Sequence, residues 1–255
     1  MKTLAVIPAR LGSTRLPRKP LRLLAGLPLV VRVWQRVVET GVADRVVVAT
    51  DSVEIVDVIR ERGGEVVMTR EDHPSGTDRV AEVASRPEFA SFEAIVNVQG
   101  DEPFVSRDAI LGAARMVTEA GFGLGTAAVR AGTAILQDPD VVKVVTADDG
   151  RALYFSRSGI PYLRAARNTR DAEMHRDRVW QHIGLYAYDR SSLMRWVALP
   201  PGPLEQIERL EQLRPLSAGM PIGVALIDEP FRPGIDTEAD LERANRDWLV
   251  HTTSS

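Results

Sequence analysis

The sequence predicts an α/β protein with a mixed, mostly parallel sheet flanked by helices. Through the first half of the 255 residues, short runs rich in valine, isoleucine and alanine alternate with segments whose apolar residues recur at helical spacing. Continuous apolar runs of this kind are typical of parallel strands buried on both faces. A strand, a helix and a second strand form a right-handed crossover that leaves the strands parallel. In the second half, strand patterns follow one another without long helices, so the sheet is expected to be mixed.

The expected helices of the first half have recognisable ends. Pro28 suits the first turn of a helix, and Gly41 ends the apolar pattern that follows. Asp51 or Ser52 can cap the next helix. The expected strands are 2–8, 45–50, 65–68 and 93–98, and the expected helices are 28–40, 53–62, 77–85 and 106–120.

The second half is less regular. The expected strands are 125–130, 141–146, 152–156, 182–188 and 221–227. The expected helices are 193–197, 203–217 with an interruption near Pro215, and 237–250. Segment 165–178 is charged and irregular, so we expect a mobile loop there. The change of pattern at 120–130 indicates an internal break within one compact unit.

Composition excludes several classes of function. The formal net charge is −3 and the cations are clustered locally, which argues against nucleic acid as a main partner. The absence of cysteine excludes disulfides, thiol catalysis and cysteine-ligated metals. No apolar run reaches membrane-spanning length, and the N-terminal run is too short for a signal-peptide core. We therefore expect a cytoplasmic protein without a membrane partner.

Segment 6–21 follows the first expected strand, at the edge where open α/β sheets bind ligands. It contains Arg10, Arg15, Arg18 and Lys19, one glycine, two small hydroxyl residues and no acid. Four neighbouring cations repel one another unless an anion lies among them. The pattern predicts a polyphosphate-binding loop, and a solvated basic loop is the alternative. A P-loop is disfavoured because the glycine spacing is absent and a proline follows the lysine.

Two acidic motifs are candidates for a metal site. Asp101 follows the fourth expected strand, at the same sheet edge as the basic loop, where a carboxylate can hold a divalent cation beside a phosphate. Asp236 precedes the last expected helix and is a candidate second ligand. The alternatives are an ordinary turn at Asp101 and a helix cap formed by Asp236 or Thr237. Spacing in the sequence does not decide between them.

Two further groups of polar residues have weaker patterns. Ser75 and Thr77 flank a glycine before an expected helix, so they either present hydroxyl and N–H groups to an anion or form a helix cap. In the second case Arg79 is a surface cation. Five residues of the second half carry no assignment from spacing alone: Arg157, His182, Tyr186, Glu205 and Gln212.

A series of motifs in this chain matches one known family in order. They are IPAR, ST, RLP and KPL within 7–21, VATD (48–51), MTR-DH-SGTDR (68–79), VNVQGDEP (96–103), VKVV (142–145), ALYFSRS-IP (152–161), HIGLYAY (182–188), PLEQIERLEQLR (203–214) and GIDTEADLER (234–243). The chain resembles the 3-deoxy-manno-octulosonate cytidylyltransferases, also called CMP-KDO synthetases, over nearly its whole length. ALYFSR, HIGLYAY and PLEQIERLEQLR are the most specific of these motifs.

The resemblance implies a Rossmann-like nucleotide-diphospho-sugar transferase fold in a single domain, 1–255. Its nucleotide-binding part would cover about 1–120, and its sugar-binding and dimerisation part about 121–230. The implied reaction joins CTP and 3-deoxy-D-manno-octulosonate (KDO) to give CMP-KDO and diphosphate, with Mg²⁺, for lipopolysaccharide biosynthesis. A homodimer is also implied. The alternatives are a nucleotidylyltransferase for a related acidic sugar and a catalytically silent nucleotide-sugar-binding regulator.

The resemblance also assigns residues to roles. The catalytic set is Arg15, Lys19, Asp101 and Asp236, of which the two aspartates are the metal ligands. The nucleotide set is Pro8, Ala9, Arg10, Arg15, Lys19, Ser75, Arg79 and Gln99. The sugar set is Gln99, Arg157, His182, Tyr186, Glu205 and Gln212. Two features depart from the family pattern: Arg18 stands where many members have glycine, and segment 163–178 matches no part of it.

Overall fold

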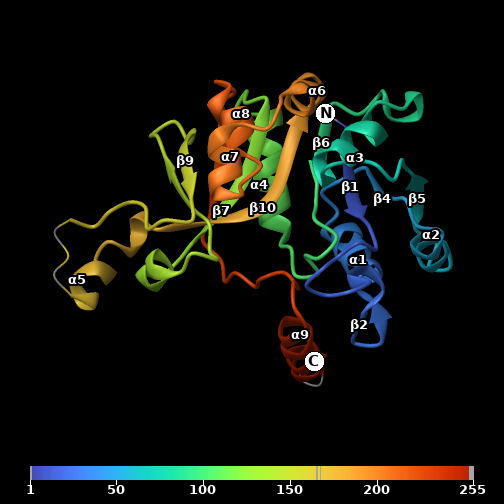
Figure 1. Cartoon of the computed structure of the whole chain (residues 1–255), viewed down its shortest axis with the longest axis horizontal. Coiled ribbons are helices and arrows are strands. Elements are labelled where there is room, and N and C mark those ends of the chain that lie inside the picture. Colours follow the sequence, from blue (N-terminus) through green and yellow to red (C-terminus); the bar gives the residue numbers. More distant parts are fainter. Residues whose placement is uncertain (1, 165, 167, 253–255) are drawn as a thin grey trace. The chain divides into compact units, whose positions relative to one another are not determined.

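A computed structural model of the chain describes residues 2–164, 166 and 168–252. Contacts between residues divide the chain into two compact units. Unit 1 comprises Met1–Arg107 and Arg232–Ser255, so the C-terminal helix joins the N-terminal half. Unit 2 comprises Asp108–Phe231. Figure 1 shows the elements of both units.

Unit 1 contains a parallel sheet in the order β6 (Ala94–Asn97), β1 (Thr3–Ala9), β4 (Arg45–Thr50) and β5 (Glu65–Met68). The apolar run of β1 has no exposed surface from Leu4 to Ile7, as expected of a strand covered on both faces. The four strands predicted for the first half, and their parallel arrangement, are confirmed.

The helices of unit 1 also agree with the sequence pattern. They are α1 (Leu29–Thr40), α2 (Val53–Arg60), α3 (Gly76–Ala84) and α9 (Glu238–Thr252). Gly41 ends α1 in a left-handed conformation, with φ of 62°. Helices α1 and α3 both pack against β1 and β4, so they cover the strands that carry the loops of the site.

A small hairpin of unit 1 was not predicted. Strands β2 (Leu23–Leu24) and β3 (Leu27–Pro28) pair across a turn in which Ala25 and Gly26 both have positive φ. The side chain of Asn245 in α9 accepts a hydrogen bond from the Ala25 amide at 2.8 Å and so ties the last helix to this hairpin. Strands of two residues contain no periodicity that a sequence pattern could show.

Unit 2 contains a mixed sheet in the order β11 (Ile222–Ile227), β7 (Leu124–Arg130), β10 (Trp180–Asp189), β8 (Lys143–Thr146) and β9 (Ala152–Ser156). Only the β11–β7 pair is parallel among these, and the other pairs are antiparallel. The register of β10 against β7 shifts between Ile183 and Tyr186. The mixed character predicted for the sheet is confirmed.

Two expectations for unit 2 need correction. Its helices are α4 (Arg107–Thr118), which starts at the boundary, α5 (Thr169–Glu173), α6 (Arg190–Ala198), α7 (Pro203–Glu208) and α8 (Leu213–Ser217). The helix predicted for 203–217 breaks at Arg209, which has φ of 56°, whereas Pro215 lies inside α8. The segment 165–178 is not wholly irregular, because it contains α5 and a 3₁₀ turn at Arg176–Arg178; residues 165 and 167 lie outside the described residues.

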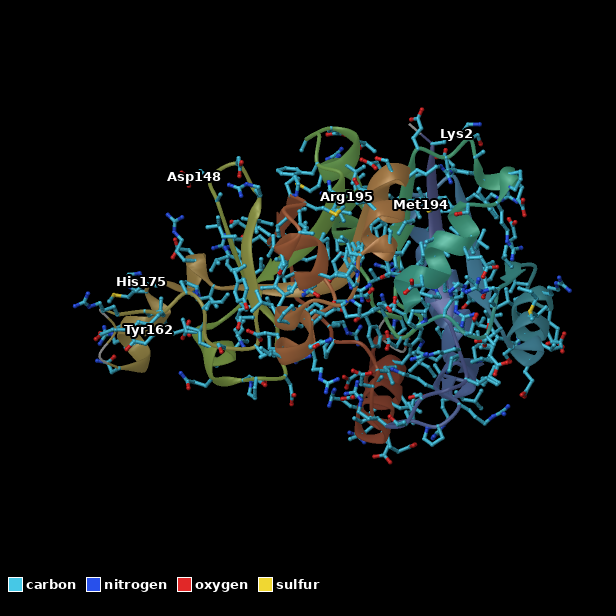
Figure 2. The ribbon with its side chains drawn as sticks, turned by 45° about the horizontal axis from the view of Figure 1, so that its top comes forward. Lys2, Asp148, Tyr162, His175, Met194 and Arg195 are labelled. Atoms are coloured by element: carbon cyan, nitrogen blue, oxygen red, sulfur yellow. The ribbon has the colours of Figure 1, made fainter. Side chains whose placement is uncertain are left out.

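The remaining regular segments are short 3₁₀ turns at Lys19–Leu21, Pro87–Phe89 and Thr133–Gln137. Near α5, the side chain of Tyr162 is 86% exposed, and it is labelled in Figure 2. Among the described residues, no helix is both long enough and apolar enough to cross a membrane.

Candidate active site

Unit 1 contains a pocket of about 420 Å³ at the carboxyl ends of β1 and β6. It is lined by all ten residues of this unit that were predicted to hold the nucleotide or the metal: Pro8, Ala9, Arg10, Arg15, Lys19, Ser75, Arg79, Gln99, Asp101 and Asp236. The sheet therefore brings together residues as far apart in the sequence as Lys19 and Asp236, which are separated by 217 residues, as the carboxyl edge of an open α/β sheet does.

The basic loop is held by its own backbone and by two buried side chains. Leu16 and Pro20 are buried, and the Lys19 amide donates to the Leu16 carbonyl at 3.1 Å. Lys19 is the first residue of the 3₁₀ turn Lys19–Leu21. Arg18 precedes this turn with φ of 56° and ψ of 32°, a left-handed conformation that glycine adopts without cost. This conformation gives a physical reason for the glycine that the family resemblance leads us to expect at this position.

Replacing Arg18 by glycine is expected to give a more stable protein than replacing it by alanine. Both variants lose the exposed ion pair with Glu54. Only glycine adopts the left-handed backbone conformation of this position without steric strain. We expect the glycine variant to melt about 2 to 4 °C above the alanine variant, as measured by circular dichroism. Equal melting temperatures would contradict this account of the loop.

The two candidate metal ligands converge on one ammonium group. Lys19 Nζ lies 2.6 Å from Asp101 Oδ2 and 2.8 Å from Asp236 Oδ1, and Arg15 also contacts Asp236 at 3.1 Å. The Ile235 amide donates to the Asp101 carbonyl at 2.9 Å, which brings the two acidic segments side by side. The two carboxylates therefore belong to one site.

The alternative interpretations of the acidic motifs hold in part. Thr237 exchanges hydrogen bonds with Asp240 at the start of α9, so Thr237 makes the capping contacts and Asp236 is left to face the lysine. Asp101 does lie in a turn, closed by the Glu102 amide donating to the Gln99 carbonyl at 3.1 Å. Here the turn directs the carboxylate into the pocket.

Gly100 is required by the close approach of two backbones. A Cβ atom added there would lie 2.7 Å from the Pro8 carbonyl oxygen and 3.6 Å from the Cβ of Ala9. Both neighbours belong to the end of β1 and line the pocket. A side chain at residue 100 would have to move backbone, which a packed interior resists.

Replacing Gly100 by alanine is therefore expected to lower the free energy of unfolding by about 1 to 3 kcal/mol and to weaken nucleotide binding. The matched control is Gly12→Ala, since a Cβ at Gly12 meets no atom within 4 Å in the same pocket. Urea unfolding of both variants tests the prediction. Equal stability of the two would mean that the contact with Pro8 is readily relieved.

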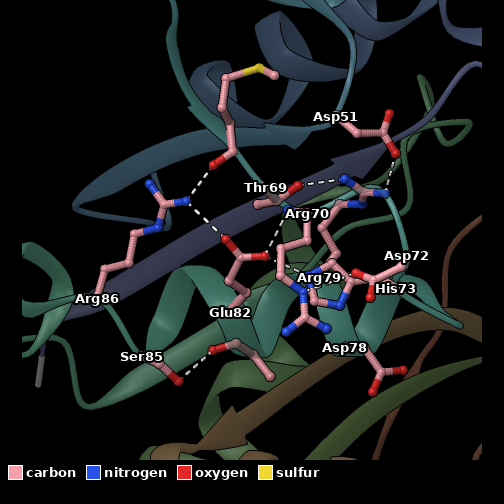
Figure 3. A network of polar contacts seen from close by, with 12 residues as sticks. Asp51, Thr69, Arg70, Asp72, His73, Asp78, Arg79, Glu82, Ser85 and Arg86 are labelled. Atoms are coloured by element: carbon pink, nitrogen blue, oxygen red, sulfur yellow. Dashed lines mark hydrogen bonds and ion pairs between the residues drawn. The ribbon is translucent and has the colours of Figure 1, made fainter.

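Glu82 holds His73, a residue that lines the pocket, and Figure 3 shows the polar contacts of Glu82. Its carboxylate accepts from the Arg70 amide at 2.9 Å, lies 2.6 Å from His73 Nε2, and pairs with Arg86 at 2.9 Å. Burial raises the pKa of Glu82, but these hydrogen bonds outweigh it and lower the pKa to about 2. The ionised carboxylate thus fixes His73, which lines the pocket.

The start of α3 combines both interpretations of its motif. The Ser75 hydroxyl accepts from the Asp78 amide at 3.3 Å and caps the helix, while Ser75 also lines the pocket. Arg79, considered a surface cation under the capping alternative, is instead buried at 2% exposure. It pairs with Asp51 at 2.6 Å and donates to the Thr69 hydroxyl (Figure 3), so a helix cap and a buried arginine occur together.

Burial and neighbouring charges shift the pKa values of two groups at this site. Burial lowers the pKa of Lys19, but the charges of Asp101 and Asp236 more than compensate and raise it. Burial raises the pKa of Glu102 to about 8, helped by the same two carboxylates. Lys19 is therefore charged, and Glu102 holds a proton at neutral pH.

The donor set fits a magnesium ion that shares its ligands with a nucleotide. Mg²⁺ is commonly held by one or two carboxylates together with substrate phosphates and water. Asp101 and Asp236 meet one cation already, at distances of 2.6 and 2.8 Å. Among the described residues there is no cluster of three or more acidic or histidine ligands that would form an all-protein cage.

The residues predicted to hold the sugar acid lie in unit 2, except Gln99. His182 and Tyr186 are neighbours in β10, with ring centroids 5.6 Å apart. Burial lowers the pKa of His182 to about 3, so the imidazole is neutral. The Thr126 hydroxyl lies 3.0 Å from His182 Nε2 and 2.7 Å from the Leu185 carbonyl, to which it donates. The His182 Nε2 proton then points to Thr126, and Nδ1 stays an acceptor.

The other three sugar candidates contact the helical part of unit 2. Glu205 forms a bidentate pair with Arg214 at 2.6 and 2.8 Å, and Gln212 is buried at the start of α8. Arg157 Nε donates to the Glu208 carbonyl at 2.9 Å. A separate pocket of unit 2, of about 410 Å³, is lined by other residues between Thr133 and Asn168.

The sequence pattern did not single out several residues that line the pocket of unit 1. They are Gly12, Ser13, Thr14, Pro20, His73, Gly76 and Gly100. His73 is the one with titratable chemistry, and it was noted only as part of a motif. His73 contacts Glu82, which lies nine residues later in α3. The sequence does not show that this helix packs back onto the loop that contains His73, so it gave no sign of the contact.

A parallel sheet with a cationic loop and paired carboxylates at one edge is the arrangement expected of a nucleotidyltransferase. A family model described as "Cytidylyltransferase" matches residues 4–222. The chain is 60% identical to the 3-deoxy-manno-octulosonate cytidylyltransferase of Gemmatimonas aurantiaca, over 100% of this chain and 98% of that protein. It is 46% identical to the protein of that name from Yersinia enterocolitica, over 95% and 97% of the two chains. The chain belongs to the family of 3-deoxy-manno-octulosonate cytidylyltransferases.

Solved structures agree with this assignment. The structure of a CMP:2-keto-3-deoxy-manno-octonic acid synthetase complexed with CTP matches with a TM-score of 0.88 and 36% identity, covering 98% of this chain and all of that one. The 4-diphosphocytidyl-2C-methyl-D-erythritol synthase of Anaerococcus prevotii matches with a TM-score of 0.63 at 16% identity, covering 97% and 98% of the two chains, which shows a shared fold. The predicted fold class and family resemblance are confirmed.

Proposed function

We propose that this chain transfers the cytidylyl group of CTP to KDO and releases diphosphate. The observation that supports this best is the pocket of unit 1, in which Arg10, Arg15 and Lys19 lie with two carboxylates at the end of β1. A triphosphate needs several cations, and a nucleotidyl transfer needs its charge neutralised. The sequence relatives and the CTP-bound structure carry the same activity in their names.

The reaction that follows from these groups is an in-line displacement. The C2 hydroxyl of the sugar acid attacks the α-phosphorus, its oxygen forms the new bond to phosphorus, and the bond to the diphosphate oxygen breaks. The hydroxyl proton passes to solvent. Arg15 and Lys19 stabilise the charge that develops on the diphosphate. Pro8 and Ala9 are proposed to hold the base, and Ser75, Arg79 and Gln99, which line the same pocket, are proposed to contact the rest of the nucleotide.

Asp101 and Asp236 are proposed to hold Mg²⁺. The ion, when bound, supplies charge neutralisation at the phosphates and lowers the pKa of the sugar hydroxyl. The sugar acid is proposed to bind Gln99, Arg157, His182, Tyr186, Glu205 and Gln212. Because His182 is neutral, Arg157 is the cation among these residues that suits the sugar carboxylate.

We also propose that the enzyme is a cytoplasmic homodimer that serves lipopolysaccharide synthesis. The dimer is checked by light scattering of the eluting protein during size-exclusion chromatography. A mass of one chain, 28.0 kDa, at micromolar concentration would contradict it.

The experiment that tests the function is a diphosphate-release assay with CTP, UTP, ATP and GTP, each with Mg²⁺, with and without KDO. Release only from CTP together with KDO is the expected result. Release from CTP only with another 2-keto sugar acid would keep the reaction class and change the substrate. CTP binding without release from any pair would favour the catalytically silent regulator.

A further inference from the structure

Arg15, Lys19, Asp101 and Asp236 form an ion-pair cluster inside the pocket of unit 1. Lys19 contacts both carboxylates, and its side chain is only 15% exposed. Arg15 contacts Asp236 alone and is two-thirds exposed. Each partner of the cluster is therefore already neutralised by another side chain before any ligand binds.

The proposed function requires different partners for all four groups. The cations are expected to contact phosphate oxygens, and the carboxylates a magnesium ion. Lys19 Nζ at 2.6 and 2.8 Å from the two carboxylates lies where a cation shared by them would lie. One ammonium and a metal ion cannot both occupy that position, because their positive charges repel at such distances.

We propose that Lys19 takes the place of the metal in the free protein and that binding of the metal nucleotide exchanges the partners of the cluster. Lys19 and Arg15 leave the carboxylates for the triphosphate, and Asp101 and Asp236 receive the metal. The proposal rests on the proposed function, because it assumes that a metal nucleotide is the ligand of this pocket.

The exchange couples the two ligands. A metal ion alone must displace the lysine from its carboxylates, and CTP alone must draw the lysine away from them. When both bind, the metal ion neutralises the two carboxylates that Lys19 has left. The triphosphate in turn neutralises Lys19 and Arg15. Coupling of this kind is reciprocal, so CTP increases metal affinity by the same factor as the metal increases CTP affinity.

The first test is Mn²⁺ binding to the full-length protein without nucleotide, measured from the electron paramagnetic resonance signal of free Mn²⁺. Three variants each remove one positive charge from the same loop: Lys19→Met, Arg15→Met and Arg10→Met. In the structure Lys19 contacts two carboxylates and Arg15 one. The ion pairs of the described residues do not include Arg10, which lines the same pocket.

The proposal predicts that Mn²⁺ affinity rises most in Lys19→Met, on the order of 5- to 150-fold, less in Arg15→Met and little in Arg10→Met. Equal increases in all three would show that only the general positive field changed and would overturn the proposal. Unchanged or weaker Mn²⁺ binding in Lys19→Met, with its thermal unfolding intact, would overturn it too. If Lys19→Met does not fold, the comparison of Arg15→Met with Arg10→Met decides.

The second test measures CTP binding in the presence of a chelator. Asp236→Asn removes a carboxylate that holds both Arg15 and Lys19, so the variant should bind metal-free CTP more tightly than the wild type. A carboxylate that only supports the fold would not produce this gain, and weaker or unchanged CTP binding would contradict the exchange. Neither test measures turnover, so failure of the diphosphate-release assay is a separate result.

Discussion

Replacing Asp101 or Asp236 by asparagine is expected to lower the rate of diphosphate release by about a hundredfold or more. Each substitution preserves shape and removes one of the two negative charges that meet at Lys19. With one carboxylate left, the site has half of the protein ligands proposed for Mg²⁺, and the phosphates lose the charge neutralisation that the transfer requires.

The matched control for these variants is Asp57→Asn, an exposed aspartate of α2 that does not line the pocket. Circular dichroism should show that all three variants fold, since neither pocket aspartate is deeply buried. Mg²⁺-dependent turnover near that of the wild type in both Asp101→Asn and Asp236→Asn would show that the metal assignment is wrong.

Replacing Lys143 by methionine is expected to destabilise the protein strongly. Lys143 has no exposed surface, yet its ammonium donates to three backbone carbonyls, those of Asp138, Val141 and Arg157. Methionine fills a similar volume without a donor, which leaves the carbonyls unsatisfied. A buried unsatisfied group costs about 1 to 3 kcal/mol and these three contacts are part-buried, so we expect a total loss of about 3 kcal/mol in the free energy of unfolding.

The loss should be visible in urea unfolding, with Lys2→Met as a control because Lys2 is exposed. The variant should also bind the sugar acid less well, because Lys143 holds the backbone of Arg157. A midpoint equal to that of Lys2→Met would mean that water or other donors replace the ammonium readily.

The parallel part of the fold could be predicted from the sequence because its signals are local. Apolar runs such as 45–50 are continuous, and Gly41 or Ser75 marks a helix end within a few residues. The basic loop and Asp101 could be placed at one edge of the sheet for a related reason, whereas Pro8, Ala9, Arg79 and Gln99 were assigned through the family resemblance. Loops that follow parallel strands meet at one edge, so their order along the chain predicts their meeting in space.

The parts of the fold and of the site that could not be predicted have no local signal in the sequence. The break at Arg209 comes from a left-handed backbone at a residue with no propensity for it, and nothing local distinguishes that arginine from its neighbours. The contact between Lys19 and Asp236 spans 217 residues of sequence. The sugar residues could be grouped only by family resemblance, because their spacing along β10, α7 and α8 follows no simple period.

The most direct test of the account is a crystal structure with CTP and Mn²⁺, in which anomalous scattering locates the metal. The account predicts an anomalous peak within coordination distance of both Asp101 and Asp236, with the triphosphate against Arg10, Arg15 and Lys19. A metal held elsewhere, or a triphosphate bound while Lys19 still bridges the two aspartates, would contradict it.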